Sequence, residues 1–496
     1  MSDPEHSQAL LGRLVPSNMI FKMAGDSFSR IEISSLEGRA QSTRLRQKLF
    51  HSLHTTLGSS EKTIKDAILA DSGYSKSEVN LEYALAISDL RKHYASVDLE
   101  QDLKAQKAVE NLKATTNVGI VYIVPAKQNL FYCVISALTA ALAAGNCVVV
   151  ELPPTLTQVS GVLRKILPSA LDADIFGVSG TRPTKDFLSK CHVLEQSDDG
   201  TDNAQSEPQA RVVAIVDRTA DILEAAMVIG ASRVSFNGRS VYAPDVVLVN
   251  EFVADNFLYH LVQTVTSPLS SKSAPASQNQ SKYLPDGHAR TLKELENNDG
   301  VRVVVSSSSG SIMEVKDRTM VPLSRRIEGR LIIVVRITSL DDAIDLANSF
   351  GTPLEANYSF ATPTEANYLA RFIDARISCI NHIPAELLVG PLAPKHPAEA
   401  PSPSPRYSQA LFRTPRPRLR HASELTTLTQ AAVRSRSTEG LESWSRAIVE
   451  PALPAMKQGD GHAVGFFDQA FLALGVSVVS LLAGTAFYAF KMLRRR

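Results

Sequence analysis

Short runs of consecutive apolar residues, each followed by a helical pattern, constrain the fold of this 496-residue chain more than any other feature. The run "VGIVYIV" at 118–124 precedes a helical pattern of small residues at 130–145, and that pattern leads into a second apolar run at 147–152. Such runs are typical of strands buried on both faces, which occur in parallel sheets covered by helices. This order predicts a βαβ unit and a parallel sheet.

The same alternation continues along most of the chain. Helical patterns separate further apolar runs at 211–217, 245–250, 301–305 and 330–337. Residues 33–114 instead carry apolar side chains at three- and four-residue intervals, which predicts helices. We therefore expect an α/β fold through about residue 390.

A long uncharged segment lies near the C-terminus. Residues 471–490 read "FLALGVSVVSLLAGTAFYAF" and precede the basic sequence "KMLRRR". A helix of this length spans about 30 Å, the thickness of a bilayer core. A helix buried in a protein core is the alternative, but the basic flank favours a membrane anchor at Phe471–Phe490. We expect a tail-anchored protein with its body in the cytosol, at the endoplasmic reticulum, the peroxisome or the mitochondrial outer membrane.

Charge and cysteine content exclude some functions. Lys and Arg number 52 against 51 for Asp and Glu, so we predict no nucleic-acid partner. The four cysteines are widely separated, which suits a reducing compartment and predicts no metal site. Seven arginines stand against one glutamate at 406–436. We interpret this stretch as a solvated linker, and contact with anionic lipid headgroups is the alternative.

Residues 234–250 read "VSFNGRSVYAPDVVLVN" and allow two interpretations. Asn-Gly is the preferred pair of a type I′ turn, which predicts a β-hairpin. The flanking residues do not alternate between apolar and polar, however. The alternative is a functional loop that leads into a buried strand at 246–249.

Several stretches, in this order, resemble the aldehyde dehydrogenase superfamily. "NVGIVYIVP" followed by "ALTAALAAGNCVVVELPP" is similar to the first βαβ unit of its cofactor domain, and "SFNGRSVYAPD" is similar to its nucleophile loop. "TSLDDAIDLANS" and "ISCINH" resemble a late helix and a strand that ends in Asn. The resemblance covers about residues 35–390 and points to the membrane-anchored fatty-aldehyde (class 3) branch. It implies a Rossmann-type cofactor domain, an α/β catalytic domain and NAD(P)-dependent oxidation of aldehydes.

The resemblance and the composition together predict the domain organisation. We expect an N-terminal tail at 1–32, a degenerate cofactor-binding domain with N-terminal helices at 33–208, a degenerate catalytic domain at 209–390, a Pro/Ser/Arg-rich linker at 391–470 with an oligomerisation strand near 407–420, a transmembrane anchor at 471–490 and a basic tail at 491–496. The oligomerisation strand would permit a homodimer, or a heterodimer with an active family member.

By resemblance, the family's catalytic cysteine is replaced by Val241. Gly238 and the triplet "APD" at 243–245 keep the family's register around this position. A thiolate must attack the aldehyde carbonyl, and valine has no nucleophile. Ser240 stands beside it, but neighbours on an extended segment point to opposite faces. The resemblance therefore predicts that the nucleophile is lost.

Two further catalytic positions are kept only in part. The family's oxyanion donor, an asparagine, corresponds to Gln128 when counted from Gly145 and to Lys127 when counted from Pro125. A glutamine amide can still donate a hydrogen bond, so Gln128 is the candidate. The general-base position is Glu207, but both glycines that follow it in the family are replaced. Without a thiol to deprotonate, Glu207 is better interpreted as a surface carboxylate.

The family's cofactor motifs are altered as well. Its Lys-Pro-Ser-Glu corresponds to "ELPP" at 151–154, so an anion replaces a cation in a site for phosphates. Its Gly-Ser loop corresponds to "LEQSDDGTDNAQSEP" at 194–208, with three aspartates where anion-binding amides are expected. The glutamate that holds the nicotinamide ribose corresponds to Arg326. We therefore predict no cofactor and no cofactor-binding residue.

Independent losses in separate segments favour a pseudoenzyme. We expect a membrane-bound scaffold, a binder of long-chain aldehydes or lipids, or a regulatory partner. An active fatty aldehyde dehydrogenase with an unconventional site, using NAD or NADP, is the alternative. A degenerating gene product is a third interpretation, against which the regular apolar patterning through residue 390 argues.

Overall fold

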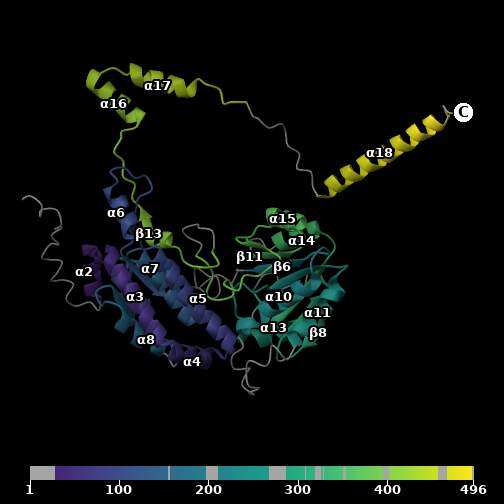
Figure 1. Cartoon of the computed structure of the whole chain (residues 1–496), viewed down its shortest axis with the longest axis horizontal. Coiled ribbons are helices and arrows are strands. Elements are labelled where there is room, and N and C mark those ends of the chain that lie inside the picture. The colour runs from purple at the N-terminus through teal and green to yellow at the C-terminus, as the bar shows by residue number, and fades with distance from the viewer. Residues whose placement is uncertain are drawn as a thin grey trace, which may run out of the picture. The chain divides into compact units, whose positions relative to one another are not determined.

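The computed structural model describes residues 28–154, 157–196, 211–266, 286–307, 309–318, 326–327, 329–349, 353–394, 402–455 and 466–493. The chain forms two compact units, Met1–Leu419 and Arg420–Arg496 (Figure 1). The described part of the first unit contains two large sheets, a two-stranded ribbon and the helices that pack against them. The described part of the second unit is helical.

The N-terminal half of the first unit is built on a four-stranded parallel sheet in the order β4–β3–β2–β5. Its strands are β2 (Ile120–Val124), β3 (Cys147–Glu151), β4 (Phe176–Ser179) and β5 (Cys191–Glu195). Helix α7 (Leu130–Ala143) connects β2 to β3, which confirms the predicted βαβ unit. Further helices in this half are α2 (Ser29–Glu37), α3 (Thr43–Ser59), α4 (Glu61–Ser72), α5 (Lys76–Ala95), α6 (Leu99–Lys107), α8 (Gln158–Ala170) and α9 (Lys185–Leu188).

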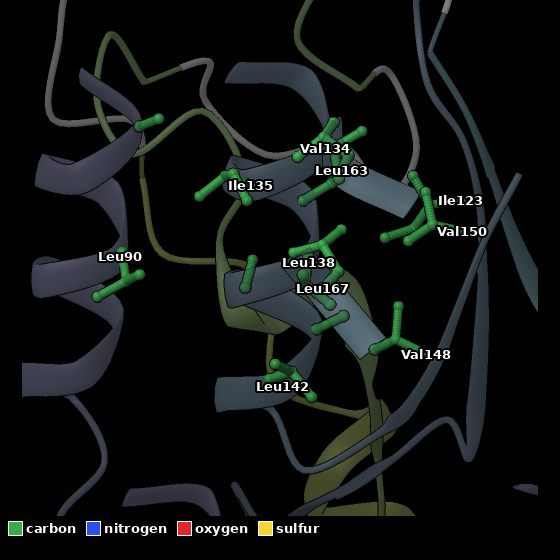
Figure 2. Packing of buried hydrophobic residues seen from close by; sticks show 14 of the residues in the cluster. Leu90, Ile123, Val134, Ile135, Leu138, Leu142, Val148, Val150, Leu163 and Leu167 are labelled. Carbon is green, nitrogen blue, oxygen red and sulfur yellow. The ribbon is translucent and has the colours of Figure 1, made fainter. Parts of the chain in front are cut away.

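Helix α7 is the centre of the N-terminal core. It is apolar on all sides, and such a helix is stable only when every side is covered. Figure 2 shows Leu138 of α7 between Leu90, which belongs to α5, and Val148, which belongs to the sheet. The helices predicted for residues 33–114 therefore supply the cover that α7 requires.

The C-terminal half of the first unit is built on a seven-stranded sheet in the order β12–β11–β6–β7–β10–β9–β8. Its strands are β6 (Val212–Val216), β7 (Val246–Asn250), β8 (Val301–Ser306), β9 (Ser311–Val315), β10 (Leu331–Ile337), β11 (Ala356–Phe360) and β12 (Ser378–Ile380). All neighbours pair in parallel except β8, which is antiparallel to β9. Its helices are α10 (Ile222–Val234), α11 (Ala254–Thr266), α13 (Asp286–Glu296), α14 (Leu340–Asn348) and α15 (Pro363–Phe372). The predicted α/β fold is thus confirmed.

A short antiparallel ribbon returns the chain to the N-terminal half. Strand β13 (Arg413–Pro415) pairs with β1 (Thr115–Asn117), and a bridge between Asn111 and Arg418 extends the ribbon. A strand therefore does occur within the range 407–420, and its role in oligomerisation stays a prediction. Residues 413–415 thus form a paired strand within the predicted linker, although Thr414 and Pro415 are exposed to solvent as the linker interpretation expects.

The second unit contains α16 (Glu424–Ser435), α17 (Glu439–Val449) and α18 (Phe466–Leu493). Helices α16 and α17 contact each other as a hairpin. Over the residues that the structure describes, no helix combines the length and the apolar character that crossing a membrane requires. The anchor predicted at Phe471–Phe490 is not confirmed.

Candidate functional site

Residues 235–245, which we call the nucleophile loop after the resemblance, connect α10 to β7. Phe236, Asn237 and Gly238 have φ values of 51°, 57° and 69°, three successive left-handed residues. A Cβ atom at Gly238 would lie 2.1 Å from the carbonyl carbon of Gly329, so only glycine fits. Strand β7 pairs in parallel with β6 and β10, so the hairpin interpretation of the Asn-Gly pair is wrong. The pair reverses the chain inside a crossover connection.

The N-terminal helices hold the start of this loop. Glu78 Oε1 accepts a hydrogen bond from the backbone N–H of Phe236 at 2.7 Å. Asn237 Nδ2 donates to the carbonyl of Ser72 at 2.9 Å, and its Oδ1 accepts from Arg330 Nη2 at 2.8 Å. Left-handed backbone costs a non-glycine residue about 1–3 kcal/mol. These three bonds offset that cost and fix the loop against both halves of the first unit.

Asp245 holds the other end of the loop. Its carboxylate accepts hydrogen bonds from the backbone N–H groups of Val212 and Ile327, each at 3.0 Å, and Arg233 Nη1 lies 3.8 Å from Oδ1. Burial raises the pKa of Asp245, and the positive charge of Arg233 opposes that rise. The aspartate of the family's "APD" triplet therefore has a structural role here.

Val241 lies between these two fixed ends. Its side chain is 1% exposed and belongs to the apolar core of the seven-stranded sheet. Ser240 is buried, and its hydroxyl accepts from the backbone N–H of Tyr242 at 3.4 Å. Cys379 lies in the same core as Val241, but burial raises the pKa of its thiol and so disfavours the thiolate. The loop therefore presents an apolar, inaccessible side chain where the resemblance requires a nucleophile.

Arg406 covers the loop next to Val241. Its guanidinium carbon lies 4.9 Å from the ring centroid of Tyr242, within the range of a cation–π contact. Its Nη2 donates to the carbonyls of Glu386 and Val389 at 3.1 and 3.0 Å, and only 3% of the residue is exposed. The solvated-linker interpretation is therefore wrong for Arg406, which is part of the core.

Tyr242 itself is held from two further directions. Its hydroxyl accepts from the backbone N–H of Ala393 at 3.0 Å, and its carbonyl accepts from the Tyr358 hydroxyl at 2.9 Å. These bonds join the nucleophile loop to β11 and to the segment that follows β12. We call Arg406 together with residues 387–393 the cover of the loop.

The other two predicted catalytic positions have different outcomes. Glu207 lies outside the described residues, so its assignment as the general-base position stays a prediction. Gln128 is half-buried just before α7, and its Nε2 group is buried without a hydrogen-bond partner among the described residues. Phe131 of α7 and Phe236 of the loop lie in the same core. No described hydrogen bond joins Gln128 to the loop.

A buried carboxyl group near Gln128 gave no signal in the sequence. Glu82 of α5 accepts a hydrogen bond from Asn129 Nδ2 at 3.0 Å and is 1% exposed. Burial raises its pKa to about 7, and the bond from Asn129 opposes the rise. Neither Glu82 nor Arg406 belongs to a recognisable motif, because their partners are backbone groups and residues far along the chain.

The carboxyl ends of the four-stranded sheet carry a polar network. In open parallel sheets, ligands bind in the crevice outside these strand ends. Here the Tyr122 hydroxyl donates to Glu151 Oε2 at 2.7 Å, and burial together with this bond raises the pKa of Tyr122. Arg182, which follows edge strand β4, forms an ion pair with Glu195 at the end of the opposite edge strand β5. The hydrogen bond from this pair raises the pKa of Arg182.

Comparisons with known proteins agree with the fold. No family model matches the chain. Rattus norvegicus aldehyde dehydrogenase family 3 member A2 is 23% identical over 360 residues, which cover 66% of this chain and 73% of that protein. Mus musculus family 3 member B1 is 24% identical over 363 residues, which cover 66% and 76%. Substrate-bound AldH of Staphylococcus aureus gives a TM-score of 0.60 at 18% identity and covers 82% of this chain and 94% of that chain.

The chain is similar in sequence and in fold to members of the aldehyde dehydrogenase superfamily. Its curated relatives include several members of family 3, which confirms the predicted similarity to the class 3 branch. A NAD-dependent benzaldehyde dehydrogenase from Corynebacterium glutamicum has the same fold, with a TM-score of 0.55, 18% identity and coverage of 72% of this chain and 84% of that chain.

Two described side chains at the carboxyl ends of the four-stranded sheet oppose the binding of a dinucleotide phosphate. Glu151 is an anion bound to Tyr122, whereas a phosphate group needs a cation or free N–H donors. The one described arginine of this network, Arg182, is already paired with Glu195 across the strand ends.

Proposed function

We propose that this protein is a catalytically inactive aldehyde dehydrogenase, a pseudoenzyme that retains the fold as a scaffold or binding module. The burial of Val241 carries this proposal. Aldehyde oxidation in the superfamily begins with attack by a thiolate, and an aliphatic side chain in an apolar core cannot replace it. Ser240 offers no substitute, because a serine without an adjacent base is a weak nucleophile.

The cover supports the same conclusion. Tyr242, the residue next to Val241, is fully buried and packs beneath the guanidinium of Arg406. Removing that cover would break the hydrogen bonds of a buried guanidinium, each worth about 1.5–3 kcal/mol. Closure of the loop and loss of the nucleophile are separate obstacles to catalysis.

An NAD(P)-dependent dehydrogenase with an unconventional site is the second candidate. It is favoured by solved structures with the same fold, whose descriptions include a NAD-dependent benzaldehyde dehydrogenase and a glyceraldehyde-3-phosphate dehydrogenase complexed with NADP. The carboxylate of Glu151 and the ion pair of Arg182 oppose it, since both remove groups that a dinucleotide phosphate requires.

Titration calorimetry of the full chain in detergent micelles separates the two candidates. NAD⁺ and NADP⁺ are titrated separately. The NAD-dependent benzaldehyde dehydrogenase of Corynebacterium glutamicum and the Methanocaldococcus jannaschii dehydrogenase that was solved with NADP are the positive controls. The pseudoenzyme proposal expects no binding heat at millimolar cofactor and no reduced cofactor at 340 nm with a long-chain aldehyde. Micromolar affinity for either cofactor, or turnover above a heat-denatured sample, would overturn it.

The fold would serve a membrane-associated role. We infer that the apolar helix α18 attaches the protein to a membrane, and that the body binds long-chain lipids or aldehydes or pairs with an active family member. The uncharged segment at 471–490 supports this. Alkaline carbonate extraction of a membrane fraction tests the attachment: the full chain is expected in the pellet, and its quantitative release would exclude an integral anchor. The choice among endoplasmic reticulum, peroxisome and mitochondrial outer membrane follows from imaging of the tagged full chain.

A further inference from the structure

No residue of the helical hairpin formed by α16 and α17 is buried. Ser423 begins α16 by accepting a hydrogen bond from the N–H of Thr426 at 3.2 Å. Arg436, in left-handed backbone with φ 55°, ends the helix and turns the chain toward α17. A Cβ atom at Gly440 would lie 3.4 Å from Leu428 Cδ2, which is ordinary van der Waals contact. The two helices therefore touch along their apolar sides.

Each helix carries one apolar stripe. In α16, Leu425 and Leu428 recur at a helical spacing, and in α17 Leu441, Trp444 and Ile448 do the same. Leu428, Leu441 and Trp444 are half-buried against the neighbouring helix. Leu425 and Ile448 remain 43% and 58% exposed, and no residue of either helix is buried. The hairpin therefore leaves one apolar side open.

An open hairpin of this size is not stable by itself. The helices have 12 and 11 residues, and isolated helices of this length are marginal in water. Most helical stability in proteins comes from the packing of an apolar face against another element. Some further surface must cover the stripes.

Charge decides which surface suits the hairpin. Residues 420–436 hold three arginines against one glutamate, a net charge of +2, whereas residues 437–450 hold one arginine against three glutamates, a net charge of −2. An anionic lipid surface would attract α16 and repel α17, so the headgroup interpretation of the arginine-rich stretch finds no support within the hairpin. A strongly charged protein partner of either sign would likewise attract one of the two helices and repel the other. In an antiparallel pair of hairpins, α16 of one copy would lie beside α17 of the other. Each helix would then face a helix of opposite net charge.

We propose that the α16–α17 hairpin is a self-association surface, covered by the same hairpin of a second copy of this chain. Two hairpins related by a two-fold axis place Leu425 and Ile448 of each copy in a shared core of four antiparallel helices. The surface is isologous, because each copy contributes the same stripes. It lies outside the superfamily fold and does not depend on the catalytic state of the body.

The test is the oligomeric state of the full chain in detergent micelles, measured by analytical ultracentrifugation over a hundredfold range of concentration. The wild type is expected to be a dimer at the upper end. Ile448→Glu places a charge in the shared core and is expected to weaken dimerisation at least about tenfold. Ser443→Glu, which adds the same charge at an exposed position of the same helix, is the matched control and is expected to dimerise as the wild type does.

A second measurement keeps the test decisive if Ile448→Glu unfolds the hairpin. Trp444 is the only tryptophan of the chain, so its emission reports the hairpin alone. In the wild type, the emission is expected to shift to shorter wavelength as concentration rises through the dimerisation range.

Three results would overturn the proposal. The first is a wild-type monomer at every concentration. The second is a dimer that Ile448→Glu and Ser443→Glu leave equally stable, which would place the interface elsewhere. The third is a Trp444 shift that requires phosphatidylcholine vesicles and leaves the mass unchanged, which would make lipid the cover.

Discussion

At the scale of single residues, Val241 belongs to an apolar core at the position that the resemblance assigns to the catalytic cysteine. Valine is neither exposed nor in a strained position, and it packs with Tyr242 in the core of the seven-stranded sheet. The residues that frame it, Gly238 and Asp245, keep the loop in shape through backbone conformation and backbone hydrogen bonds. Neither of those roles depends on a sulfur atom. The loop can therefore persist after its chemistry is lost.

Restoring the sulfur alone should not restore activity. Val241→Cys is close in volume to the original residue and is expected to cost less than about 1.5 kcal/mol of stability. The new thiol would share the apolar core of Cys379, where burial raises the pKa of a thiol. We expect no NAD-dependent turnover and slow alkylation by iodoacetamide at pH 7.5, followed by mass spectrometry of the peptide that contains residue 241. Rapid alkylation of the folded protein would contradict the closed loop.

Arg406 should stabilise the fold through contacts that a lysine at the same position cannot make. Lysine cannot place one planar group over Tyr242 and also reach the carbonyls of Glu386 and Val389. We expect Arg406→Lys to lower the free energy of unfolding in urea by about 2–4 kcal/mol. The exposed Arg420→Lys is the control, with an expected change within about 0.5 kcal/mol. Equal effects of the two substitutions would show that the cover contributes little.

Glu82 should give the protein a pH-dependent stability. Burial raises its folded-state pKa from 4.5 to about 7, so between these values the folded protein keeps a proton that the unfolded chain has lost. This stabilisation is fully present below about pH 4.5 and is lost as the pH rises through 7. Relative to Glu82→Gln, the wild type should therefore lose about 3 kcal/mol of unfolding free energy between pH 4.5 and 7.5.

Urea unfolding of both proteins at the two pH values measures this difference. Glu37→Gln, on the exposed side of α2, is the matched control. A difference between wild type and Glu82→Gln that is independent of pH would exclude a proton on Glu82.

At the scale of secondary-structure elements, the left-handed turn at 236–238 positions the whole site. Gly238→Ala would place a methyl group inside the backbone of Gly329 and impose an unfavourable φ, so we expect a loss of at least about 3 kcal/mol or a failure to fold. Gly161→Ala is the control, because Gly161 lies inside α8 with no atom near its missing Cβ. That substitution should stabilise the protein by about 0.5–1 kcal/mol. Thermal unfolding followed by circular dichroism compares the two, and similar melting temperatures would contradict the assigned strain.

The elements also show what could be predicted from sequence and what could not. Apolar runs such as 118–124 predict strands because burial on both faces leaves a continuous local signal. Strands of three residues, such as β12 and β13, carry too few side chains for such a signal. Arg406 lacked a signal for a different reason: its acceptors are backbone carbonyls whose positions depend on the tertiary fold. The Asn-Gly pair predicted the reversal correctly but not the parallel crossover that contains it.

At the scale of the whole molecule, the chain combines a large body with a separate helical unit. The body reaches Leu419 and contains every residue of the candidate site, whereas the second unit begins at Arg420. The body has extensive apolar cores, but α16 and α17 have no buried residue. The two units should therefore differ in stability.

Unfolding should accordingly proceed in two steps. Trp444 fluorescence, which reports the second unit, should show a lower urea midpoint than far-UV circular dichroism, which reports mainly the body. If the hairpin is covered by a second copy, the fluorescence midpoint should rise with protein concentration and the midpoint of the body should not. Coincident midpoints at all concentrations would show that the two units unfold together.

The position of Arg406 over Tyr242 also constrains which substitutions could give residue 241 a catalytic role. An accessible residue 241 would require the guanidinium to leave its carbonyl acceptors, and that change lowers stability before any chemistry is gained. A cysteine arising first at this position would be buried and neutral to selection. Loss of the Arg406 cover alone would destabilise the protein. A cysteine at position 241 alone would bring no activity. With the cover in place, catalysis at position 241 would require both changes together.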